Sequence, residues 1–494
     1  MELDARVCDR ARLARDARFD GRFFIAVLST GIYCRPICPS PTARRDNVRY
    51  FRSAGEALAA GFRPCLRCRP EAAPGTPAWK GTSTTVTRAL RLIEEGALQE
   101  QNLAGLSHRL GVSARHLRRL FLIHLGASPI AVAKMWRLNF AKQLISDTDL
   151  PMSRVALAAG FRTVRRFNDS IRGLYGRTPS ELRRHRCPAL HAGEDEYVFR
   201  LPYRPPYDWE SLVAFFAAHA IPGVEEIVSG AYRRSFAQDG RHGILEVRHN
   251  EGAHALEARV RFSEPVPLLP IVTRLRGTFD LAADTTAITR HFRGDPLLGP
   301  LVRKYPGLRI PGAWDPFELS VRAILGQGTT PAAESALSGE LACRFGERLL
   351  VSDAGGLTVV FPAAQVLAKA RLAGLPPVRA RAIRSLARAA VSGLFGRAGA
   401  DEESLASLVR VAATSEWTAQ YIALRAFCQP DAFPADDLAL LRAAGLHGPR
   451  AAATLNALAE RWRPWRAYAA VYLWRAAAER AVQTSQHPAL AMTA

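Results

Sequence analysis

Four cysteines near the start of the chain, arranged in two close pairs, constrain its fold more than any other feature. Cys34 and Cys38 form the first pair, Cys65 and Cys68 form the second, and 26 residues separate the pairs. This spacing is typical of a tetrahedral zinc site. We therefore expect zinc as a cofactor, with all four cysteines as its ligands, in a small α/β domain over residues 1–76.

Such a site has two interpretations. In the first, the zinc is purely structural. In the second, it is reactive, because zinc keeps a cysteine deprotonated and a thiolate is a far better nucleophile than a thiol. Four thiolates on one zinc ion carry a formal charge of −2, which makes a bound sulfur electron-rich. Arginines crowd both pairs of cysteines, and the residue pattern alone leaves both interpretations open.

The positive charge of the chain is concentrated in its first part. The 494 residues carry a net charge of +22, and residues 1–190 contain 33 lysines and arginines against 15 acidic residues, a net +18. This balance favours an anionic partner, most often nucleic acid. No run of 18 apolar residues indicates a membrane span, and the first residues lack the apolar segment of a signal peptide. We expect a cytoplasmic protein that associates with the nucleoid when it binds DNA.

Composition shifts divide the chain into four predicted domains of a multidomain α+β protein. Turn-rich or polar stretches at 73–78 and 187–196 indicate linkers. Residues 256–262 alternate apolar and polar side chains, as half-buried strands do. The predicted domains are the zinc domain at 1–76, an all-α domain at 83–186, a small α+β sheet domain at 197–310 and a second all-α domain at 311–486.

The cysteine motifs resemble one known family. Residues 23–39 read FFIAVLSTGIYCRPICP and residues 54–70 read AGEALAAGFRPCLRCRP, which is similar to the N-terminal domain of the Ada methyltransferases. The resemblance implies that Cys34 accepts a methyl group from a methylated DNA phosphate. It also places Thr30, Arg63 and Arg67 near the DNA backbone. Methylation would reduce the charge of the zinc centre from about −2 to about −1, so that it repels DNA less.

The helical segment contains two copies of one pattern. Residues 102–110, the turn 111–113 and residues 114–121 suit a helix-turn-helix unit with Ser113 as the N-cap. One copy alone is also compatible with an ordinary helical hairpin, but residues 152–168 repeat it. The segment resembles AraC-type DNA-binding domains, which implies transcriptional activation and RNA polymerase as a partner. Candidate contacts with bases or phosphates are Arg115, Arg118, Arg162, Arg165 and Asn168.

The C-terminal half resembles the 3-methyladenine DNA glycosylases of the AlkA type, of the helix-hairpin-helix superfamily. The resemblance rests on residues 311–327 (PGAWDPFELSVRAILGQ) and on residues 416–427, 431–442 and 464–474. It implies excision of alkylated bases, such as 3-methyladenine or 7-methylguanine, from double-stranded DNA. Asp437, with Asp436 beside it, aligns with the catalytic aspartate. Trp417, Tyr421 and Trp474 align with the aromatic base pocket, where rings attract a cationic base.

Each of these residues also has an ordinary structural interpretation. Asp436 and Asp437 suit an N-cap pair, and the tryptophans suit core packing.

Two departures from the family pattern matter: Val411-Ala412-Ala413-Thr414-Ser415 replaces the glycine-containing hairpin before Glu416, and Gly328 stands where a relative has an apolar wedge. A lysine is absent from the position of Trp417, so Schiff-base lyase chemistry is not expected.

Two alternatives to a combined methyltransferase, activator and glycosylase therefore remain. In one, the glycosylase half is inactive and only holds DNA for a methylation-triggered regulator. In the other, the zinc is structural and the chain is a glycosylase with additional DNA-binding domains.

Overall fold

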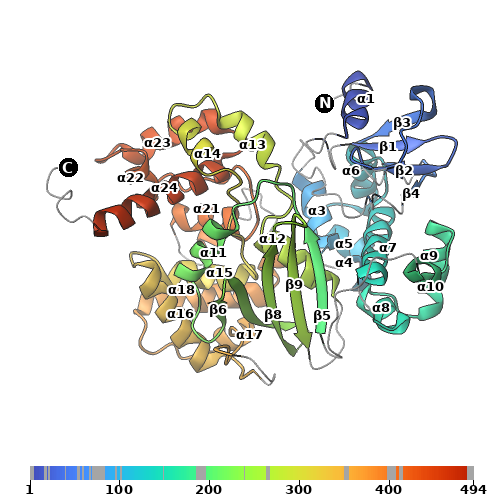
Figure 1. Ribbon diagram of the computed structural model, residues 1–494. Coiled ribbons are helices and arrows are strands. Elements are labelled where there is room, and N and C mark those ends of the chain that lie inside the picture. Colours follow the sequence, from blue (N-terminus) through green and yellow to red (C-terminus); the bar gives the residue numbers. More distant parts are fainter. Residues whose placement is uncertain are drawn as a thin grey trace. The chain divides into compact units, whose positions relative to one another are not determined.

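A computed structural model of the protein shows helices throughout and two β-sheets (Figure 1). It describes residues 5–15, 19, 23–38, 40–52, 56–57, 60–65, 68, 70, 84–94, 97–100, 103–147, 150–184, 196–238, 240–262, 268–349, 355–397, 408–410 and 415–486. The chain forms two compact units. The first comprises Met1–Arg204, Phe236–Arg276 and Leu350–Ser352, and the second comprises Pro205–Ser235, Gly277–Leu349 and Asp353–Ala494. The four-domain division stays a prediction.

The N-terminal region is built on a small sheet in the order β3-β1-β2-β4. Its strands are β1 (Phe24–Val27), β2 (Ile32–Cys34), β3 (Val48–Phe51) and β4 (Arg63–Pro64). β1 pairs antiparallel with β2 and β3, whereas β4 runs parallel to β2. The parallel pairing brings residues from either side of a long connection to the same end of the sheet.

Two helices pack against opposite faces of this sheet. On one face, Phe23 and Ile25 form a cluster with Cys8 and Ala11 of α1 (Ala5–Leu13). On the other face, apolar residues from β1, β2 and β3 pack with Met135 and Trp136 of α7 (Pro129–Asp147). The alternation of side chains along each strand explains how a short sheet has two buried faces.

The helix-turn-helix pattern is present twice. The two units are the helix pairs α5–α6 and α8–α9. The helices of this segment are α3 (Thr84–Glu94), α4 (Ala97–Glu100), α5 (Leu103–Arg109), α6 (Ala114–Leu125), α7, α8 (Met152–Ala158), α9 (Val164–Tyr175) and α10 (Pro179–Arg184). Ser113 accepts the backbone N–H of His116 and caps α6, as predicted, and Thr163 caps α9 in the same way. Both helices end at a glycine in the left-handed region, Gly126 and Gly176.

The second sheet has the order β5-β9-β8-β7-β6, and the chain passes from one unit to the other within β7. Its strands are β5 (Glu196–Pro202), β6 (Glu225–Val228), β7 (Ala231–Gln238), β8 (Arg241–Asn250) and β9 (Ala255–Phe262). Ser229 and Gly230 join β6 to β7 with positive φ angles of 50° and 73°. Two such residues suit the type I′ turn of a tight hairpin.

Helices make up most of the second unit. They are α11 (Trp209–Ala218), α13 (Thr285–Phe292), α14 (Leu298–Lys304), α15 (Pro316–Leu325), α16 (Pro331–Phe345), α17 (Ala364–Leu367), α18 (Pro377–Val391), α19 (Leu394–Arg397), α21 (Glu416–Arg425), α22 (Leu438–Ala443), α23 (Ala451–Ala459), η4 (Glu460–Trp462) and α24 (Arg466–Gln486). α12 (Leu269–Thr278) begins in the first unit and ends in the second. No helix in the described part of the chain is both long and apolar enough to cross a membrane.

α15 lies at the centre of the second unit, because every residue from Phe317 to Leu325 is buried. Asp315 caps the helix and Pro316 occupies its first position. Two charged residues of α15 are buried with partners: Glu318 pairs with Arg234 at 2.7 Å, and Arg322 pairs with Glu334 at 2.8 Å. Pairing of this kind is what makes buried charges tolerable.

Asp280 is expected to make the second unit pH-sensitive. Its burial raises the pKa of the carboxyl group to about 6, although Arg309, the Tyr468 hydroxyl at 2.8 Å and the Ile310 N–H at 3.2 Å favour the ionised form. Since the unfolded value is about 3.9, the folded state binds more protons between these values, and stability falls as the pH rises through this window.

We therefore expect Asp280→Asn to be more stable than the wild type above pH 6, by up to about 3 kcal/mol. Asn tolerates the positive φ of 46° at this position. Thermal unfolding of both proteins at pH 5, 6, 7 and 8 measures the difference in their stability. This difference should increase from pH 5 to pH 7, and a constant difference would show that Asp280 is ionised over the whole range.

Candidate functional site

The four cysteines of the predicted metal site converge at one end of the first sheet. Cys34 is the last residue of β2, and Cys65 directly follows β4, which lies parallel to β2. The Cys65 N–H donates to the Tyr33 carbonyl at 2.9 Å and extends this pairing by one residue. Cys38 reaches the cluster through a turn in which its N–H donates to the Arg35 carbonyl at 3.1 Å.

The geometry of the cluster fits a tetrahedral metal ion. All four Sγ atoms lie within 4.8 Å of one another, and those of Cys38 and Cys65 are 4.0 Å apart. The edge of a tetrahedron with Zn–S bonds of about 2.3 Å is about 3.8 Å. The metal-binding family reported below and these four sulfur donors identify zinc as the cofactor.

The four thiols of the cluster are electrostatically coupled. Hydrogen bonding with Cys34 holds the pKa of Cys38 far below its usual range, and hydrogen bonding with Cys34 raises the pKa of Cys68 far above its usual range. The Arg35 N–H donates to Cys68 Sγ at 3.3 Å. Cys65 and Cys68 are buried, whereas Cys34 and Cys38 are only partly buried.

The predicted DNA contacts of this region are exposed where the structure describes them. Thr30 lies in the turn between β1 and β2, and its hydroxyl is 3.4 Å from the Val27 carbonyl. Arg63 is exposed on β4. Arg67 lies outside the described residues.

All five predicted contact residues of the helix-turn-helix units are exposed. The opposite faces of their helices are buried through Leu117 and Phe121 in α6 and through Phe167 and Ile171 in α9. Each helix therefore packs with one side and presents cations on the other, as a helix that enters a DNA groove must. The exposed residues are Arg115, Arg118, Arg162, Arg165 and Asn168.

Asp437 lies at the centre of a second candidate site, in the second unit. It is the N-cap of α22, and its Oδ1 accepts the backbone N–H groups of Ala439 at 2.9 Å and Leu440 at 3.0 Å. Two indole N–H groups also reach it: Trp474 donates to Oδ1 at 3.2 Å and Trp417 donates to Oδ2 at 2.9 Å. The sequence left open whether Asp437 caps a helix or serves the site. One carboxylate can do both, because Asp437 caps α22 and also accepts the two indole N–H groups. Its neighbour Asp436 is exposed.

The three predicted pocket aromatics lie together around this carboxylate. Trp417 and Tyr421, one turn apart on α21, stack with their ring centroids 5.0 Å apart and their planes at 12°. Trp474 of α24 meets Tyr421 edge-on at 6.0 Å. All three side chains are half-buried, so the rings are not simply core residues.

Arg425 is a further residue of this site, which the sequence analysis did not identify. Its guanidinium donates to the Tyr421 hydroxyl at 2.5 Å and to the Pro311 carbonyl at 2.7 Å, and it lies over the Phe215 and Tyr421 rings. The only sequence signal was its position four residues after Tyr421, which puts both side chains on one helix face. Arg425 fixes the orientation of the Tyr421 ring.

The two departures from the family pattern have different structural outcomes. Of the altered hairpin, residues 411–414 lie outside the described part of the chain, while Ser415 caps α21 by accepting the Thr418 N–H at 3.3 Å. Glu416 is exposed and accepts a hydrogen bond from Gln420 at 3.0 Å. Gly328 has a φ of +66° with open space around its missing Cβ. Its backbone conformation, not crowding, disfavours a wedge side chain there.

Three family models match the chain. The metal binding domain of Ada matches residues 7–71, a helix-turn-helix domain matches residues 106–185, and the AlkA N-terminal domain matches residues 198–315. The helix-turn-helix match and the exposed basic helices identify a DNA-binding protein. The expected multidomain α+β fold is confirmed.

Three relatives cover different parts of the chain. The chain is 40% identical over 149 residues to the bifunctional transcriptional activator/DNA repair enzyme Ada of Escherichia coli, covering 30% of this chain and 40% of that one. It is 34% identical over 285 residues to DNA-3-methyladenine glycosylase 2 of Escherichia coli, covering 56% of this chain and 96% of that one. It is 39% identical over 484 residues to a Mycobacterium tuberculosis protein named "probable bifunctional transcriptional activator/DNA repair enzyme AlkA", covering 96% of this chain and 97% of that one. The chain therefore belongs to this family of bifunctional transcriptional activators and DNA repair enzymes.

Proposed function

We propose that the protein removes alkylated bases from double-stranded DNA by hydrolysing the N-glycosidic bond, at the site around Asp437. The observation that carries this proposal is one carboxylate held by four N–H donors beside three half-buried aromatic rings. A fixed negative charge stabilises the positive charge that develops on the sugar as the bond breaks. The relatives named above support DNA alkylation damage as the substrate class.

The aromatic rings account for the choice of base. 3-Methyladenine and 7-methylguanine are cationic as nucleotides, and electron-rich rings attract such a base by about 0.5–2 kcal/mol each. An extruded base stacks on the rings, and Asp437 then faces the sugar. Arg425 donates to the Tyr421 hydroxyl and so holds the ring in place before a substrate binds. The cluster is therefore preorganised, which reduces the cost of binding.

The indole N–H groups are expected to contribute to catalysis beyond packing. Trp417→Phe and Trp474→Phe each keep an aromatic ring but remove one donor to Asp437, and we expect base release to fall by about tenfold in each. Trp462→Phe is the matched control, because Trp462 donates in the same way to a different carboxylate, that of Asp295, at 2.8 Å. Base release at the wild-type rate in both pocket variants would assign Trp417 and Trp474 to packing alone.

We also propose that Cys34 takes a methyl group from DNA methylphosphotriesters. In this step a bond forms between Cys34 Sγ and the methyl carbon, the bond from that carbon to the phosphate oxygen breaks, and a phosphodiester anion leaves. Zinc on the four cysteines supplies an ionised sulfur at neutral pH. Burial disfavours Cys65 and Cys68 as the reacting sulfur, and the resemblance to the Ada methyltransferases selects Cys34 over the equally partly buried Cys38. The other three sulfurs hold the site, and Thr30, Arg63 and Arg67 are the proposed contacts with the DNA backbone.

The helix-turn-helix units then convert this event into promoter binding. Loss of one negative charge at Cys34 weakens the repulsion of DNA phosphates. The exposed residues of α6 and α9, together with Arg162 just before α9, contact the operator. RNA polymerase is the proposed partner of the bound activator. The alternative, an inactive glycosylase half that only holds DNA, is favoured by Gly328 and by the charge of Glu416 at the start of α21.

One experiment tests both reactions together. The purified full-length chain is incubated with duplex DNA methylated by a radiolabelled agent, and label is measured as free bases and on the protein. We expect label in both fractions. Label on the protein without free bases would support the regulator alternative, and free bases without label on the protein would support a structural zinc.

A further inference from the structure

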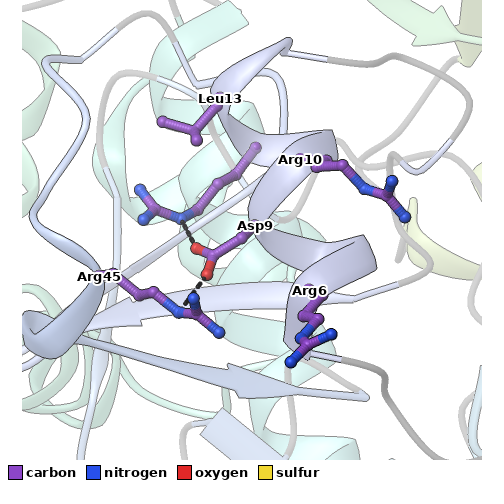
Figure 2. Close-up of a pocket in the computed structure, with 6 residues that line it drawn as sticks. Arg6, Asp9, Arg10, Leu13 and Arg45 are labelled. Carbon is purple, nitrogen blue, oxygen red and sulfur yellow. Dashed lines mark hydrogen bonds and ion pairs between the residues drawn. The ribbon is translucent and has the colours of Figure 1, made fainter.

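An open cavity of about 560 Å³ lies beside α1 in the first unit, and arginines line most of it (Figure 2). Four guanidinium groups and one carboxylate give its lining a net charge of +3. A cavity with this balance fits an anion. The lining residues are Arg6, Asp9, Arg10, Arg12, Leu13 and Arg45.

Asp9 holds two of the four arginines of this cavity, Arg12 and Arg45. Its Oδ1 accepts Arg12 Nε at 2.8 Å and its Oδ2 pairs with Arg45 Nε at 2.8 Å, while the Tyr50 hydroxyl also donates to it. Burial alone would raise the pKa of Asp9, but hydrogen bonds from Tyr50 and Arg12 and the charges of Arg12 and Arg45 lower it. The carboxylate is thus a fixed anchor. Arg45 uses Nε for this pair, and its side chain is 64% exposed, so its terminal nitrogens are available to a ligand.

The strand register places this cavity on the same face of the sheet as the methyl acceptor. Tyr50 of β3 pairs with Ile25 of β1, and Ile25 pairs with Cys34 of β2. Residues that are directly paired across strands project from the same face. Tyr50, which contacts Asp9, therefore lies in one row with Cys34, two strand spacings or about 10 Å away. No motif in the sequence connects these residues.

We propose that this cavity binds an unmodified phosphate of the DNA backbone while Cys34 meets the methylated one, an inference that rests on the proposed methyl transfer. A methylphosphotriester is uncharged and offers the protein no ionic attraction. The zinc–thiolate cluster, with its formal charge of −2, repels the neighbouring phosphates. A cationic site on the same face of the sheet compensates for both effects and holds the strand against the acceptor sulfur.

The test measures methyl transfer to the zinc-loaded, full-length protein as a function of DNA concentration and of salt. In the double variant Arg6→Gln/Arg45→Gln we expect the half-saturating DNA concentration to rise roughly tenfold. The slope of log affinity against log salt should decrease by about 1, the value of one lost phosphate contact. The rate at saturating DNA should stay unchanged, because neither residue touches the reacting atoms.

The control variant Arg248→Gln/Arg259→Gln removes the same charge from exposed positions, 51% and 45% accessible, on β8 and β9. An equal loss of affinity in this control would overturn the proposal as a general charge effect. If the double variant does not fold, Arg6→Gln alone, at an exposed position, should give part of the effect.

The experiment distinguishes failure of the proposed methyl transfer from failure of the proposed phosphate site. Absence of methyl transfer in the wild type would reject the proposed function itself. Normal transfer with the same half-saturation in wild type and variant would reject only this site. Inorganic phosphate serves as a probe for a free anion: if its ³¹P line broadens with wild type but not with the variant, while DNA binding is equal in both, the cavity binds a small anion and not DNA.

Discussion

Asp437→Asn is expected to reduce the release of alkylated bases from methylated duplex DNA by about 100- to 1000-fold, as the loss of one preorganised electrostatic group does in other enzymes. The substitution removes the negative charge that faces the sugar and changes the shape of the side chain little. The carbonyl oxygen of Asn can still accept the N–H groups of Ala439 and Leu440, so α22 keeps its cap. The nitrogen replaces Oδ2 and faces the Trp417 N–H, which costs about 1–3 kcal/mol of stability.

Asp436→Asn is the matched control, since Asp436 is the exposed neighbour of Asp437 and carries the same charge. We expect it to release bases at the wild-type rate. Free bases are separated by chromatography after a time course at excess enzyme, which isolates chemistry from product release. Equal losses in both variants would show that only the local charge matters. Full activity of Asp437→Asn would remove Asp437 from the reaction.

The same time course decides between an active glycosylase and the regulator alternative. The concern came from the altered hairpin and from Gly328. In the structure, Ser415 caps α21 and Gly328 has a left-handed backbone. Asp437 keeps both of its indole donors, Trp417 and Trp474. If the wild type releases no bases while it still binds duplex DNA, the loss of activity is caused by the missing wedge or the altered hairpin and not by the cluster around Asp437.

The cap at Ser113 and the four-cysteine metal site could be predicted from the sequence, because both depend on local patterns. Ser113 before a helix and four cysteines in two pairs each leave a signal within a few residues of the chain. The contact of Trp417 and Trp474 with Tyr421 was expected only through a family resemblance, and their role as a base pocket stays a prediction. Spacing alone does not bring α24 next to α21.

Arrangements that depend on register could not be predicted in this way. In the parallel pairing of β4 with β2, Ile32 lies opposite Arg63. The alternation of apolar and polar residues along a strand does not indicate which other strand will pair with it. The row from Tyr50 to Cys34 depends on two such pairings. Arg425 is equally hidden, because a buried arginine that holds a ring differs in no sequence feature from a surface arginine on a helix.

Cys34→Ser is expected to abolish methyl uptake by the protein, from a single methyl group per chain to none. Serine is nearly isosteric, but its hydroxyl is a weak nucleophile and a poorer zinc ligand than a thiolate. Three cysteines remain, so we expect zinc to bind with lower affinity and the sheet to persist. Label on the protein and zinc content are measured on the same samples. Cys68→Ser, which removes a buried sulfur, should lose both zinc and uptake.

Cys343→Ser controls for methylation of ordinary thiols, since Cys343 is an exposed free cysteine outside the cluster. Its uptake should equal that of the wild type. If Cys34→Ser fails to fold, mass spectrometry of methylated wild-type protein gives the same answer, because the added methyl group must lie on the peptide that contains Cys34. A methyl group on Cys38, Cys65 or Cys68 would overturn the assignment of Cys34 as the methyl acceptor. Methyl on Cys34 together with a gain in DNA affinity would connect the chemistry of one sulfur to promoter binding through the charge of the zinc centre.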